Sequence, residues 1–102
     1  MSKPKYNQTT LFIERNKDAL RAAVIDTITN LTKRNAMFTR DGDSLDSARK
    51  ITFAEHVWYF ESAKSFDLDK FRGMKIDAVC GFDLLSKMQY QELRAIIKAS
   101  HE

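Results

Sequence analysis

The chain has 102 residues, of which 43% are hydrophobic and 30% are charged, and this composition excludes an intrinsically disordered protein. Only three glycines and one proline are available for the tight turns of a β-sandwich or barrel, so helices are favoured. The net charge of +3 is uneven, since residues 1–51 have ten basic and six acidic side chains, a local net charge of +4. Nucleic-acid-binding domains usually concentrate more charge than this on one face.

Cys80 is the only cysteine, so no intrachain disulfide can form, and this is typical of proteins in a reducing compartment. No apolar run approaches the roughly 20 residues that a helix needs to cross a bilayer, and residues 1–10 are polar. We therefore expect a cytoplasmic protein with no membrane partner.

Residues 1–8 are polar and without periodicity, which predicts a flexible tail before a single helical domain over residues 9–102. The clearest periodic signal predicts one long helix from about residue 11 to residue 35, with Thr9 or Thr10 as its N-cap. At ~100° per residue, one narrow stripe contains its apolar positions Ile13, Leu20, Val24, Ile28 and Leu31, with Phe38 still in phase. Such a stripe requires partner helices from the same chain or from a second copy.

Residues 39–47 break this periodicity and place three aspartates around Gly42. A calcium-binding loop that starts at the first of them would need an oxygen ligand at its fifth position and a glutamate at its twelfth. Those positions are Leu45 and Thr52, so no calcium site is expected. The segment instead predicts a turn followed by a short helix over residues 45–50.

The segment from Ile51 to Phe60 is dense in aromatic side chains and contains the only tryptophan, Trp58, beside Tyr59. Thr52 and Glu55 have the spacing of a capping box, which favours a helix. On that helix Trp58 and Tyr59 would leave the core face in opposite directions, so at least one of them would face a partner. A strand is the alternative, because β-branched and aromatic residues favour pleated surfaces.

Two further helices are predicted towards the C-terminus: Ser65 can cap a short helix that stops before Gly73, and residues 89–100 have helical spacing of apolar side chains. Together these elements predict an all-α fold, a compact small bundle of four to five helices with a long N-terminal helix. The alternative fold class is α+β, with Ile51 to Phe60 as a strand.

No set of side chains is typical of a catalytic, metal or cofactor site. Cys80 lies on an apolar stripe, where a buried hydrophobe is usual, and His56 diverges by ~100° from its neighbour Glu55 in a helix. One cysteine and two histidines give no zinc-site spacing, and the isolated glycines form no phosphate-binding loop. We expect neither enzymatic activity nor a metal or cofactor.

The sequence therefore favours a non-enzymatic regulatory or accessory protein that acts by binding another protein. Trp58 and Tyr59, with the neighbouring Glu55, are its expected contacts, because tryptophan and tyrosine often anchor interfaces. A homodimer through the stripe of the first helix is a further expectation.

The alternative function is a nucleic-acid-binding transcriptional regulator. Lys33, Arg34 and Arg40, at and just past the end of the long helix, are its expected phosphate contacts. Arg94 and Lys98 on the last helix are weaker candidates for the same role.

Trp58→Ala or Tyr59→Ala is expected to weaken partner binding while lowering the free energy of unfolding less than Phe53→Ala does, because Phe53 lies on the predicted core face. Denaturant unfolding and a partner-binding assay measure the two effects. If both substitutions unfold the domain, these aromatic residues are core and their interpretation as an interface is wrong.

Overall fold

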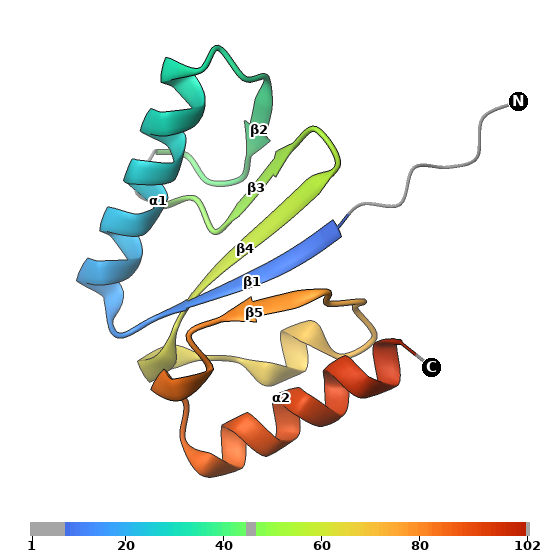
Figure 1. Ribbon diagram of the computed structural model, residues 1–102. Helices are drawn as coiled ribbons and strands as arrows, with labels where there is room; N and C mark the ends of the chain where they lie inside the picture. The colour runs from blue at the N-terminus through green and yellow to red at the C-terminus, as the bar shows by residue number, and fades with distance from the viewer. Residues whose placement is uncertain (1–7, 45–46, 102) are drawn as a thin grey trace, which may run out of the picture.

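The protein has an α+β fold in this computed structural model, which describes residues 8–44 and 47–101. A five-stranded sheet with the strand order β2-β3-β4-β1-β5 separates two layers of helix (Figure 1). One face is covered by α1 (Lys17–Lys33), and the other by α2 (Lys87–Ser100) and the short 3-10 helix η3 (Leu68–Phe71).

The central strand is β1 (Gln8–Glu14), which pairs in parallel with β4 (His56–Ser62) on one side and with β5 (Ala78–Cys80) on the other. The sheet continues in antiparallel pairing from β4 to β3 (Lys50–Phe53), and from β3 to β2 (Phe38–Arg40). The two edges of the sheet are therefore β2 and β5.

Two hydrophobic cores lie on opposite faces of the sheet, and β1 contributes to both. Consecutive residues of a strand point to opposite faces, so Leu11 and Ile13 point to one core and Phe12 to the other. The core on the α2 side contains the buried residues Leu11, Ile13, Phe71, Ile76 and Leu93. The core on the α1 side contains Leu20, Val24, Ile28, Leu31, Ala48, Ile51 and Phe60.

The prediction of an all-α bundle of four to five helices is wrong, and so is the single helix over residues 11–35. Residues 8–14 form β1, and α1 begins only after Asn16, whose side chain accepts a hydrogen bond from the Ala19 amide at 2.9 Å. Ile13 happens to share the helical phase of the α1 stripe. The predicted periodicity of 3.6 therefore extends into a segment whose structural period is two.

Residues 51–60 form neither one helix nor one strand, but the turn and most of both strands of a β-hairpin. Ile51 on β3 pairs with Trp58 on β4, and the chain reverses at Ala54 and Glu55. Ala54 has a φ of +49°, a left-handed conformation that glycine or asparagine usually adopts in such turns. The turn thus lacks its usual sequence signal, and the predicted capping box does not form. The class named as the alternative, α+β, is correct, with two strands in place of one.

The predicted C-terminal helix is confirmed as α2. It begins at Lys87 because Ser86 caps it: the Ser86 hydroxyl accepts from the Gln89 amide at 3.2 Å, and the Gln89 side chain accepts from the Ser86 amide at 3.1 Å. This reciprocal arrangement satisfies two backbone donors that the first turn would otherwise leave unpaired.

The remaining predictions are only partly met. The short helix after Ser65 exists as η3, with Asp67 as its N-cap. Lys50, predicted as the end of a short helix, belongs to β3, and residues 45–46 of that prediction lie outside the described residues. Residues 1–7 of the predicted tail also lie outside them.

Gly81→Ala is expected to destabilise the fold more than Gly73→Ala. Both glycines have a positive φ, +97° and +82°, so alanine costs about 1–2 kcal/mol at either position. A Cβ at residue 73 would meet nothing within 4 Å, whereas one at residue 81 would overlap the carbonyl oxygen of Ile13 and force β1 to shift. Denaturant unfolding of the two variants measures the difference. Equal destabilisation would contradict the close approach of residue 81 to β1.

Candidate functional site

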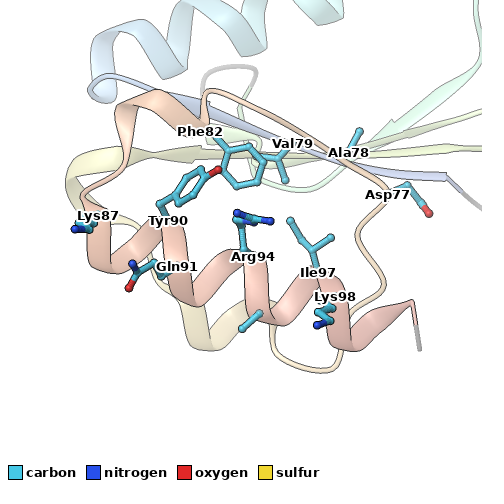
Figure 2. Close-up of a pocket in the computed structure, with 11 residues that line it drawn as sticks. Asp77, Ala78, Val79, Phe82, Lys87, Tyr90, Gln91, Arg94, Ile97 and Lys98 are labelled. Carbon is cyan, nitrogen blue, oxygen red and sulfur yellow. The ribbon is translucent and has the colours of Figure 1, made fainter.

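A groove of about 800 Å³ lies between β5 and α2 (Figure 2). Asp77, Ala78 and Val79 lie along one side of it, and side chains of α2 project towards them from the other. Asp77 is near the Lys98 end of α2, while Phe82, in the turn after β5, is near its beginning. The strand and the helix therefore run alongside each other in opposite directions.

The inner surface of the groove is apolar. Val79 and Ile97 are half-buried and also pack against the core on the α2 side. The rings of Phe82 and Tyr90 pack edge to face, with centroids 5.1 Å apart and an interplanar angle of 66°. Aromatic pairs prefer this geometry, so the two rings support each other as one wall of the groove.

α2 adds a row of cations to the groove. Lys87, Arg94 and Lys98 fall within about 40° of one another at ~100° per residue, and all three are exposed. The Arg94 guanidinium lies 5.8 Å from the centroid of the Tyr90 ring, a cation–π distance that keeps its charge over the aromatic wall. Within the part of the chain that the structure describes, none of the three makes an ion pair.

No strand in the described ranges 8–44 and 47–101 pairs with the outer edge of β5. The Asp77 amide donates to the Thr9 carbonyl at 2.9 Å, and the Thr9 amide donates to the Asp77 carboxylate at 2.8 Å, so residue 77 is bonded to β1. Alternate residues of a strand direct their backbone groups to the same neighbour. Thr9 therefore faces β5, and so does Leu11, two residues further along β1. Leu11 is in parallel register with Val79, so Ala78 and Cys80 direct their N–H and C=O groups to β1, and Val79 directs its own groups towards the unpaired edge.

Trp58 and Tyr59 lie on opposite faces of the sheet, so the structure does not bring them into one contact surface. The Trp58 ring is half-buried on the α1 side, with its centroid 4.6 Å from that of Phe53. The Tyr59 ring packs on the α2 side, 5.7 Å from Phe71. Glu55 is exposed in the turn of the hairpin. Their part in partner binding stays a prediction.

The three basic residues predicted to contact phosphates lie at the other end of the sheet. Lys33 ends α1, Arg34 is its C-cap, and both are exposed. Arg40, on the edge strand β2, donates to the carbonyl oxygens of Gly42 at 3.0 Å and Ser44 at 3.2 Å. Its guanidinium is thus bound to its own loop, and the phosphate contact stays a prediction.

His56 and Cys80 do not form a catalytic pair. They lie on β4 and β5, which are separated by β1, and they pair with Gln8 and Phe12, four positions apart along that strand. Within residues 8–44 and 47–101, no group of three His, Cys, Asp or Glu side chains is placed to hold a metal ion. No helix in these ranges is long and apolar enough to cross a membrane.

The sequence predictions do not identify the groove. β5 has only three residues, too few for an alternating pattern to be recognised. The cation row could be found from the periodicity of α2, in which Arg94 and Lys98 are predicted only as weak nucleic-acid contacts. No pattern in the sequence indicates that this basic face of α2 lies beside the edge of a strand.

The Cys80 thiol is exposed at the open edge of β5, so we expect it to react with a thiol reagent in the native protein at a rate close to that of the denatured protein. The absorbance of the released thiolate measures this rate, with Cys80→Ser as the blank. Reaction only after denaturant is added would show that the edge is covered.

Comparisons with protein-family models, with curated proteins and with solved structures give no match. The groove itself combines an apolar surface, an open strand edge and a row of cations.

Proposed function

We propose that the protein is a non-enzymatic regulatory or accessory module that binds a segment of another protein in the groove between β5 and α2. The observation that supports this most directly is that an apolar groove runs along an unpaired strand edge. A peptide that adds to such an edge gains backbone hydrogen bonds, and its alternate side chains enter the adjoining groove.

The surface of the groove supports a peptide ligand. Binding sites typically combine an apolar lining with a few polar groups that fix orientation. Here Val79, Phe82 and Ile97 supply apolar area, and exposed cations follow the length of α2. A nucleic acid would also be attracted by the cations, but the apolar inner surface offers no partner for its phosphates.

The apolar stripe of the first helix, which motivated the expectation of a homodimer, is already covered within the chain. Val24 is 0% exposed and Leu20 is 3% exposed, because the α1 stripe packs against the sheet of its own chain. The partner proposed here is therefore a different protein that binds on the α2 side.

Site-specific photocrosslinking in the native host tests this function. A photoreactive amino acid at Gln91, an exposed lining residue of the groove, is expected to form a covalent adduct with a partner protein. The matched control is the same amino acid at Ala22, which is exposed on α1. Equal adducts at the two positions, or none at residue 91, would contradict the proposal.

A salt titration of DNA binding tests the alternative function. Affinity for duplex DNA that falls steeply with salt, and that is lost in the Lys33→Ala/Arg34→Ala variant, would favour a nucleic-acid-binding regulator over the proposed one.

A further inference from the structure

We infer that the groove selects an extended, acidic segment, which adds to the outer edge of β5 and places its carboxylates against the cations of α2. This inference rests on the proposed function, because it names the chemistry of the partner that binds there. Three features support it: the direction of the backbone groups of β5, the spacing of the cations, and the excess of cations over carboxylates among the described residues that line the groove.

The backbone of β5 is arranged to accept a neighbouring strand. Val79, in the middle of β5, directs its N–H and C=O groups outward, while Ala78 and Cys80 direct theirs to β1. The side chains of Ala78 and Cys80 are exposed. An added strand would pair with Val79 through both of its outward groups, and the sheet would then have six strands.

The cations of α2 match the repeat of such a strand. Arg94 and Lys98 are four residues apart, which is about 6 Å along a helix at 1.5 Å per residue. Residues i and i+2 of an extended peptide are ~6.6 Å apart and point to the same side. Because α2 runs alongside β5 (Figure 2), two acidic residues separated by one position on the added strand would meet Arg94 and Lys98 together.

The charge of the groove is not neutralised within the described residues. Lys87, Arg94 and Lys98 line it together with a single carboxylate, that of Asp77, giving a net charge of +2. The Asp77 carboxylate already accepts the Thr9 amide at 2.8 Å and lies 4.0 Å from the His101 ring. It is thus engaged with the end of β1 and with the C-terminus of α2, and the cation row is left for an acidic ligand.

The other open edge of the sheet provides a contrast. On β2, Arg40 is the cation beside the edge, and its guanidinium is bound to the carbonyl oxygens of Gly42 and Ser44. Acidic selectivity is therefore expected at β5 and not at β2.

Peptide titration with the full chain tests the inference. The probes are three short peptides with blocked ends, in which valine alternates with glutamate, with serine or with lysine. We expect the glutamate peptide to bind more tightly than the serine peptide by roughly two- to thirtyfold, the range for two exposed ion pairs, and the lysine peptide to bind most weakly. In the Arg94→Glu/Lys98→Glu variant the order of the glutamate and lysine peptides should reverse. An unchanged order would overturn the acidic selectivity.

Strand addition is tested at Val79. Val79→Pro removes the outward amide, and proline is tolerated on an edge strand whose amide faces solvent, so the fold should be kept while binding of every peptide is lost. Val79→Ala also shortens the side chain but keeps the amide, and it is the matched control. If the proline variant does not fold, a glutamate peptide N-methylated at alternate residues replaces it and should not bind. Normal binding in either case would overturn strand addition.

Different results would reject the proposed protein-binding function and the inferred acidic strand. A groove-specific adduct at residue 91, together with no selectivity for the glutamate peptide, would preserve the proposed function and reject the acidic strand. Slowed exchange of the Val79 amide on addition of the glutamate peptide, measured by NMR, would support both. Unchanged exchange with saturating peptide would reject the strand and place the ligand elsewhere.

Discussion

The parallel pairing of β1 with both β4 and β5 determines where the other elements lie. Parallel neighbours need crossover connections, and the two crossovers here lie on opposite faces of the sheet. The connection from β1 to β4 contains α1, and the connection from β4 to β5 contains η3. Both faces of β1 are consequently covered, which is why its consecutive residues Leu11 and Phe12 are both apolar.

The groove is a consequence of where α2 rests. α2 follows β5 in the chain and contacts η3, and Leu93 is buried in one cluster with Phe71. Because α2 lies on η3, it runs beside β5 and leaves the outer edge of the strand open. The same packing turns its polar face, with Arg94 and Lys98, towards that edge. Fold and candidate site thus depend on one contact between two helices.

The sequence predicts the helices of this fold better than its sheet. The C-terminal helix and the buried stripe of α1 are recovered, because each has a regular apolar period over several turns. β1 is missed because Ile13 continues the helical phase by chance. The hairpin is missed because Ala54, rather than glycine or asparagine, adopts the left-handed turn conformation. The groove could not be predicted, since it depends on the pairing of a three-residue strand with β1.

The register of β1 also has a consequence for how this chain folds. Gln8 pairs with His56, 48 residues later, and Thr10 pairs with Ala78, 68 residues later. During synthesis β1 emerges before both of its partner strands, so its apolar side chains stay without their sheet neighbours until those segments have followed. Closing such long loops is entropically costly, and topologies with high contact order fold more slowly than helical bundles of similar length. β1, the central strand of the native sheet, is therefore expected to pair with its neighbours late in folding.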